Sequence, residues 1–235
     1  MAYLHPGAFG AAAADGEARF RTFVDSAFSD FRARRANTLV LDLRNNAGGD
    51  NSYSDYLIAY LASKPFRWYS KFSLKTSEML KAHTRQQAAP GDTSDYARAI
   101  LHHRNGEVFS YDFPPQNPVP AAKRFTGRVL VLVNRQTYSM AAVSAALLQE
   151  YGFAKIVGEE TADLPTLHAS QFSFVLPRTG IEVKVPKGYI VRPNGSEKRT
   201  GVRPDYPVRD HLLDEQDEVL TYLLTRVLRP GAAAK

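Results

Sequence analysis

Two apolar runs constrain the fold of this chain most strongly, because each ends at a polar turn and is followed by a helical pattern. The first run covers residues 38–43 and leads through a Gly/Asn-rich turn into a helical stretch at 53–61. The second covers residues 128–133 and leads into a helix that begins at or near Ser139. Strand–loop–helix units of this kind build layered α/β domains. We therefore expect one α/β domain with a strand-rich C-terminal portion.

The remaining periodicity fits the same architecture. Apolar residues on one face predict an amphipathic helix that opens at Asp15, and these residues are Phe20, Phe23, Val24, Ala27, Phe28 and Phe31. Further strands are expected at 2–9, 154–158, 170–176 and 181–185, and short helices at 77–83 and 94–103. A closing helix is expected at 214–228, and its predicted buried side consists of Val219, Leu220, Leu223, Leu224, Val227 and Leu228.

The composition indicates a globular protein with a sizeable core. Of the 235 residues, 44% are hydrophobic and 23% are charged. The formal net charge is +6, but Lys and Arg are scattered among Asp and Glu, so we expect no nucleic-acid partner. Cysteine is absent, which excludes disulfides and thiolate metal sites, and we expect neither a metal nor a cofactor. No membrane-spanning run and no signal peptide are visible.

A serine occupies the turn before the second of the two helices. Two interpretations of Ser139 fit the local pattern. As an N-cap, its side chain would accept hydrogen bonds from the first-turn N–H groups of the helix. As a nucleophile, it would stand where the same kind of N–H group can stabilise an oxyanion.

Two adjacent glycines follow the first apolar run. Gly48 and Gly49 end the segment LVLDLRNNAGGD, and glycines there let a ligand approach main-chain N–H groups. A tight turn is the alternative, and the spacing matches neither GxGxxG nor a P-loop. In an open α/β sheet, the carboxyl ends of the strands face one crevice. We therefore expect this turn and Ser139 to lie together as parts of an acyl-transfer site.

Four segments resemble one family. LVLDLRNNAGGD resembles the D-L-R-x-N-x-G-G signature of the C-terminal processing peptidases, the tail-specific, tricorn-core serine proteases. TGRVLVLVNRQTYSMAA, IVGEET and GVRPDYPV follow in the family's order, and AYLHPGAF resembles the first strand of the catalytic core. The resemblance covers nearly the whole chain except residues 64–126.

The resemblance implies a ClpP/crotonase-like α/β core and serine endopeptidase activity on peptides or C-terminal protein tails. It implies that Ser139 is the nucleophile and that an oxyanion hole is formed by the backbone N–H groups of Gly48, Gly49 and Met140. It also implies an exported protein, periplasmic or secreted. The oligomeric state is left open.

The chain departs from the family at the position of the general base. Many members pair the serine with a lysine in a run such as G-E-x-T-x-G-K, whereas this chain reads GEETADL with Leu164 at the lysine position. Leucine cannot accept a proton. Tricorn-like relatives use a histidine and a glutamate, so we predict His168 as the base and Glu197 as its orienting partner. His5, on the first strand, is the alternative histidine, and an ordinary packed or solvated imidazole is the alternative for both.

Two other functions stay open. A non-catalytic relative would bind peptides or small apolar ligands in the same cleft; the loss of the lysine favours it, whereas Ser139 and the glycine turn favour the enzyme. The second open function is acyl-CoA chemistry of the crotonase type. It is less favoured, because crotonases need no serine at the start of the helix. No PDZ module is recognisable in the 235 residues, and we expect residues 64–126 to form a lid or side insertion over the cleft.

Overall fold

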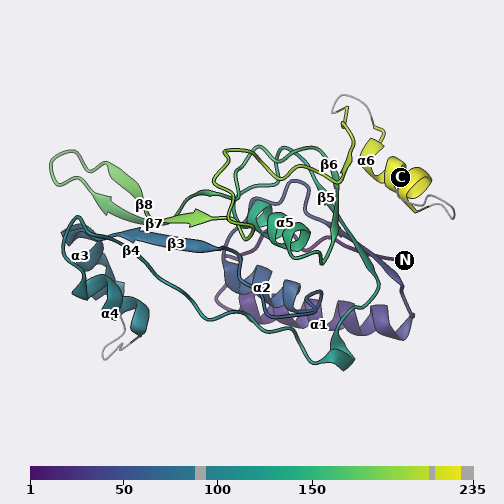
Figure 1. Ribbon diagram of the computed structural model, residues 1–235, viewed down its shortest axis with the longest axis horizontal. Coiled ribbons are helices and arrows are strands. Elements are labelled where there is room, and N and C mark those ends of the chain that lie inside the picture. The colour runs from purple at the N-terminus through teal and green to yellow at the C-terminus, as the bar shows by residue number, and fades with distance from the viewer. Residues whose placement is uncertain (88–93, 212–214, 229–235) are drawn as a thin grey trace. The chain divides into compact units, whose positions relative to one another are not determined.

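The computed structural model describes residues 1–87, 94–211 and 215–228, which form two compact units (Figure 1). The first unit comprises Met1–Trp68, Pro115–Pro165 and Arg199–Lys235, and the second comprises Tyr69–Pro114 and Thr166–Lys198. The second unit thus combines most of the segment 64–126 with a later stretch of the chain. The lid role of that segment stays a prediction.

The first unit is built on a parallel five-stranded sheet. Its strands, in spatial order, are β1 (Ala2–Leu4), β2 (Thr38–Asp42), β5 (Arg128–Val133), β6 (Lys155–Gly158) and β9 (Tyr206–Pro207). Strands covered on both faces read as continuous apolar runs rather than alternating ones. For this reason the runs at 38–43 and 128–133 predicted β2 and β5 closely.

Helices cover both faces of this sheet. One core cluster joins alternate residues of β2 and β5 to α1 (Gly16–Ala33), α2 (Asn51–Ala59) and α5 (Met140–Glu150). A smaller cluster joins the intervening residues, such as Val40 and Leu130, to α6 (Glu218–Tyr222) and the π-helix η2 (Leu223–Val227). A short 3₁₀ turn, η1 (Ala121–Lys123), lies in the connection before β5. The sheet therefore separates two apolar layers.

Two predicted core residues are exposed. Phe23 of α1 is 44% exposed, because the buried stripe of that helix consists of Phe20, Val24, Phe28 and Phe31. Leu224 is 43% exposed, because the buried side of the C-terminal helices consists of Val219, Leu223 and Val227, which are spaced four residues apart. The predicted start of the closing helix at Asp214 lies outside the described residues.

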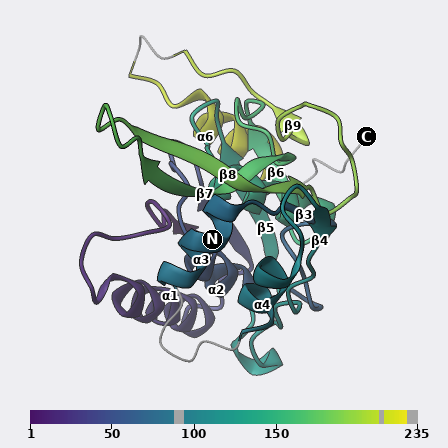
Figure 2. The same cartoon turned by 90° about the vertical axis from the view of Figure 1, so that its left-hand side faces the viewer.

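The second unit contains an antiparallel sheet with two helices (Figure 2). The strand order is β4 (Val108–Ser110), β3 (Lys71–Lys75), β8 (Glu182–Val191) and β7 (Leu167–Val175), and the helices are α3 (Glu78–Gln87) and α4 (Asp95–His102). Both helices were predicted. Strands β3 and β4 were not predicted from the sequence, because both are short and β3 mixes charged with apolar residues, as in KFSLK.

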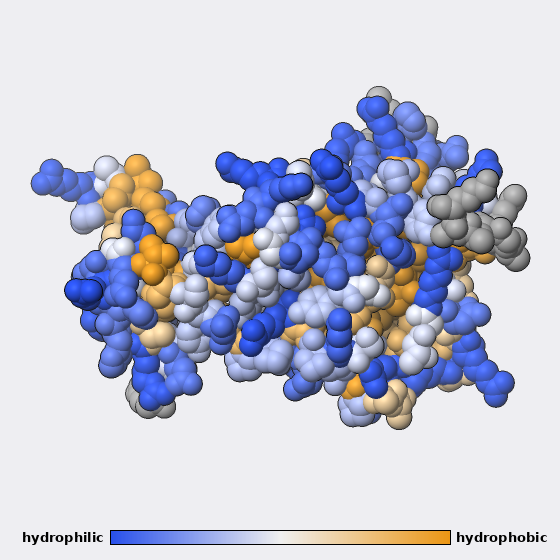
Figure 3. All heavy atoms as spheres, in the orientation of Figure 1, coloured by the Kyte–Doolittle hydropathy of each residue, from blue (hydrophilic) through white to orange (hydrophobic). Residues whose placement is uncertain are grey.

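The surface of this second unit includes an apolar patch. The β7–β8 hairpin exposes Val175, Leu176 and Ile181, which are 60%, 37% and 58% exposed, and Figure 3 shows apolar side chains over it. None of the described helices has the length and apolar content that a bilayer-crossing helix requires.

Candidate active site

The two loops that leave β2 and β5 are held together by a buried asparagine. Asn134, 6% exposed, follows β5 and faces Asn45, which follows β2. Its Oδ1 accepts the backbone N–H groups of Asn45 and Gln136, both at 3.1 Å, and its Nδ2 donates to the Asn45 Oδ1 at 2.8 Å. One side chain thus fixes both loops at the carboxyl ends of adjacent parallel strands.

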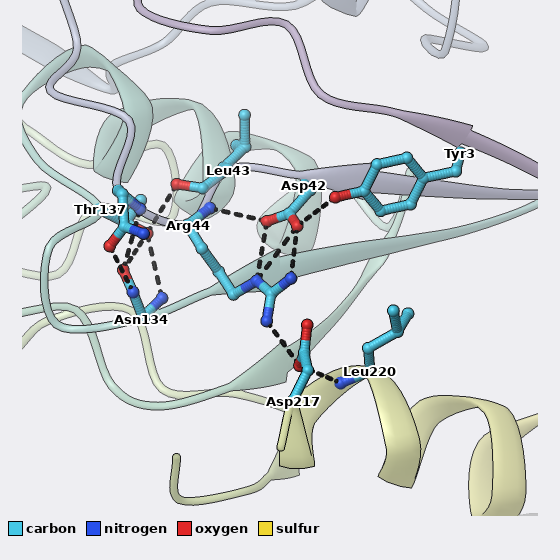
Figure 4. Close-up of polar contacts among 9 residues, drawn as sticks. Tyr3, Asp42, Leu43, Arg44, Asn134, Thr137, Asp217 and Leu220 are labelled. Atoms are coloured by element: carbon cyan, nitrogen blue, oxygen red, sulfur yellow. Dashed lines mark hydrogen bonds and ion pairs between the residues drawn. The ribbon is translucent and has the colours of Figure 1, made fainter. Parts of the chain in front are cut away.

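A buried threonine ties the turn before α5 to the same loop. The hydroxyl of Thr137, fully buried, donates to the Leu43 carbonyl at 2.9 Å and accepts the Asn134 N–H at 3.1 Å (Figure 4). The Tyr138 N–H donates to the Asn46 carbonyl at 2.9 Å. The segment NRQTYS, which reads as an ordinary polar turn, is therefore locked against the loop after β2.

Ser139, the next residue, has a backbone conformation that L-residues rarely adopt. Its φ is +50° and its ψ is −126°, and it is half-buried. Its side chain makes no capping hydrogen bond to α5, so the structure does not bear out the N-cap interpretation. The Ser139 N–H instead donates to the Oδ2 of Asp163 at 2.5 Å. Strained residues of this kind concentrate at functional sites.

Gly48 packs directly against this serine. Its φ is +79°, and a Cβ built on it would lie 2.7 Å from the Met140 nitrogen and 2.8 Å from the Ser139 Cβ. The Gly48 N–H donates to the Oδ1 of Asn46 at 2.9 Å. Met140 is the first residue of α5, so its N–H has no acceptor inside the helix. The expected meeting of the glycine turn and the serine is therefore present.

Gly49 is needed for a different contact. Its φ is +137°, and an added Cβ would lie 1.9 Å from the Phe9 carbonyl oxygen. Phe9 bridges this turn, because its N–H donates to the Gly48 carbonyl at 2.9 Å and its carbonyl accepts the Asp50 N–H at 2.7 Å. The second glycine therefore lets the segment after β1 approach the turn.

Asp163 was not among the residues predicted from the sequence. It follows β6, and its backbone carbonyl accepts the hydroxyl of Thr161 at 2.8 Å, while that hydroxyl accepts the Val202 N–H at 2.9 Å. Its Oδ1 accepts the Leu164 N–H at 2.9 Å. The one available signal was its position in GEETADL, where the family run has glycine.

The predicted base and its partner belong to the second unit. His168, on β7, and Glu197 are both exposed and belong to the second unit, whereas Ser139, Gly48 and Met140 belong to the first. The His168 ring packs on the Tyr189 ring across the β7–β8 pair, with centroids 4.9 Å apart. His5 belongs to the first unit, where it lines a cavity with Tyr3, Asp42, Arg44, Asn45, Asn134, Asp210, His211, Glu215, Gln216 and Asp217. Among the described residues, no cluster suited to holding a metal ion is found.

The D-L-R part of the first signature has a structural role. Arg44 joins Asp42 at 2.7 Å to Asp217 at 2.8 Å, and the Tyr3 hydroxyl donates to Asp42 at 2.6 Å (Figure 4). Asp217 caps α6 by accepting the Leu220 N–H at 2.8 Å. Burial and the hydrogen bond to Asp42 raise the pKa of Tyr3 to about 12. Burial alone would lower the pKa of Arg44, but its bonds to both aspartates raise it. This network anchors α6 to the loop after β2.

Comparison with known proteins agrees with this architecture. The model of peptidase family S41 matches residues 1–208. The structure is similar to a photosystem II D1 C-terminal processing protease, at 21% identity and a TM-score of 0.55 over 94% of this chain and 46% of that one. It is also similar to mature CPAF, at 17% identity and a TM-score of 0.63, over 87% of this chain and 46% of that one. A structure of mature CPAF complexed with lactacystin gives a TM-score of 0.64 at 18% identity, again over 87% of this chain and 46% of that one.

The chain thus spans about half the length of the chain in each of these three solved structures. A comparison with curated protein sequences gives no match. The predicted fold class, α/β of the ClpP/crotonase-like type, is confirmed, with a parallel sheet and a separate antiparallel sheet.

Proposed function

This chain belongs to peptidase family S41, the serine peptidase family that includes the C-terminal processing proteases, and from that premise we propose that Ser139 is a catalytic nucleophile. The proposed activity is endopeptidase cleavage of peptides or C-terminal protein tails through an acyl-enzyme. One observation carries the proposal: the strained Ser139 immediately precedes α5 and packs against Gly48, and its side chain makes no capping hydrogen bond.

In the proposed reaction, the Ser139 Oγ attacks the carbonyl carbon of the scissile peptide and loses its proton to a base. The carbonyl oxygen becomes an oxyanion, which the Met140 N–H and the glycine turn would stabilise. The Gly48 N–H is already bonded to Asn46, so Met140 and Gly49 are the favoured donors. The amine then leaves with the proton, and water hydrolyses the acyl-enzyme.

We assign the role of general base to His168, with His5 as the alternative. Glu197 is assigned the role of orienting the His168 imidazole. Leu164 at the lysine position supports a histidine, because its side chain accepts no proton. His168 and Glu197 belong to the same compact unit. The segment 64–126 is proposed as a lid, since a covering segment excludes water and selects extended peptides.

A fluorophosphonate probe tests the nucleophile. We expect covalent labelling of the parent at Ser139, located by mass spectrometry, and none in Ser139→Ala. Ser144→Ala is the matched control, because Ser144 lies on the same helix, is 2% exposed and donates to the Met140 carbonyl at 2.6 Å. A parent that resists the probe, or labels equally well without Ser139, contradicts the proposal.

A peptide-binding protein without turnover is the second candidate. It is favoured by Leu164, which removes the base that the resemblance implies at that position. Saturable binding of a peptide by a parent that neither cleaves it nor reacts with the probe would establish this alternative.

A further inference from the structure

The contact between Asp163 and Ser139 points to a function for a residue that the family signature does not include. We propose that Asp163 is a positioning residue, whose carboxylate holds the Ser139 backbone in the conformation that presents its hydroxyl. This inference rests on the proposed function, because it takes Ser139 as the nucleophile. The contact itself is a 2.5 Å hydrogen bond from the Ser139 N–H to the Asp163 Oδ2.

Ser139 needs such an acceptor for two reasons. Its φ of +50° and ψ of −126° are unfavourable for an L-residue and persist only where surrounding contacts enforce them. It also precedes the first turn of α5, so its N–H has no acceptor within the helix. A carboxylate is the strongest acceptor that a side chain can offer to an N–H group.

The carboxylate of Asp163 is itself held in place. One oxygen accepts the Ser139 N–H, and the other accepts the Leu164 N–H at 2.9 Å. The backbone of Asp163 is fixed by the hydroxyl of Thr161, which is 3% exposed. Gly201 packs closely against Thr161, because a Cβ added to Gly201 would lie 1.9 Å from the Thr161 carbonyl oxygen. A rigid loop therefore presents the acceptor.

This arrangement links three of the sequence segments that resemble the family. The loop after IVGEET supplies the carboxylate, GVRPDYPV fixes that loop, and the turn before α5 supplies the serine. A negative charge at the start of a helix is favourable for the helix dipole. The same charge would oppose an oxyanion forming nearby, so the expected benefit is geometric rather than electrostatic.

The test is the rate of fluorophosphonate labelling in Asp163→Ala and Asp163→Asn. Alanine removes the acceptor, so we expect labelling about ten- to a hundredfold slower than in the parent. Asparagine keeps an acceptor oxygen without the charge, so we expect a rate within about tenfold of the parent. The Ser139 amide proton, followed by NMR, should be strongly deshielded in the parent and in Asp163→Asn but not in Asp163→Ala.

Asp205→Ala is the matched control. Asp205 also accepts a backbone N–H with its carboxylate, that of Ile156 at 2.8 Å, but at the start of β6 rather than after its end. We expect this variant to lose stability in urea and to keep the parent's labelling rate. If Asp163→Ala and Asp205→Ala lose the same stability and are labelled equally slowly by the probe, the positioning role is overturned.

Other outcomes also decide the question. Parent-like labelling in Asp163→Ala, or equal loss in the alanine and asparagine variants, overturns the inference and leaves the nucleophile intact. An unlabelled parent overturns both the proposed function and this inference. If Asp163→Ala does not fold, the parent spectrum decides, because a Ser139 amide proton at an ordinary shift is incompatible with the short hydrogen bond.

Discussion

A buried carboxylate on α2 makes the stability of this protein depend on pH. Asp55 is 6% exposed; one of its oxygens accepts the Asn51 Nδ2 at 3.0 Å, and the other is buried without a partner among the described residues. Burial raises the pKa of Asp55 to about 6, with a further contribution from the nearby Asp50 and an opposing one from Asn51. We predict that Asp55→Asn stabilises the protein at neutral pH.

The magnitude follows from the linkage between proton binding and folding. Raising the pKa of Asp55 from its ordinary value of 3.8 to about 6 corresponds to about 3 kcal/mol. The folded state binds the proton more tightly than the unfolded state. Its contribution to stability is therefore fully present below pH 3.8 and is lost as pH rises to about 6. Asparagine resembles the protonated acid, so the variant should gain up to about 3 kcal/mol above pH 6.

Urea unfolding of the parent and of Asp55→Asn, measured between pH 4.5 and pH 8, is the assay. The difference in unfolding free energy should be largest at pH 8 and shrink steadily toward pH 4.5. Asp30→Asn is the control, because Asp30 is 50% exposed and pairs with Arg34 on the surface of α1. Surface pairs contribute little, so that variant should change by less than about 1 kcal/mol. A gain that is independent of pH, or a destabilised variant at pH 8, refutes the reasoning.

Three further substitutions, one of them with a matched control, test the candidate site and the contacts that support it. Gly48→Ala should abolish probe labelling, whereas Gly106→Ala, also at positive φ but facing open space, should only lose stability; equal labelling in both would contradict the packing argument. Arg44→Met should cost about 3–5 kcal/mol in urea unfolding, because it removes the ion-pair partner of the buried Asp42; a loss below about 1 kcal/mol would contradict it. His168→Ala should abolish peptide hydrolysis at parent-like stability, and retained turnover would mean that His5 is the general base instead.

The sequence predicted the parallel core because the burial of a strand is a local property. Strands covered on both faces must be apolar at every position, so residues 39–41 and 129–133 identified β2 and β5 without knowledge of their partners. The turn after each strand was predicted from the point where the apolar run ends. The meeting of Ser139 and Gly48 was predicted because parallel strands place their carboxyl ends at one edge of the sheet.

The tertiary structure alone decided which distant side chains meet. Asp163 reaches the Ser139 N–H across 24 residues of sequence, and Arg44 reaches Asp217 across 173. The strain at Ser139 was equally invisible, because serine at a turn is compatible with an ordinary cap. Residue periodicity reports which face of an element is buried. It carries no information about which loops meet, since that depends on strand order and register, which only the folded chain fixes.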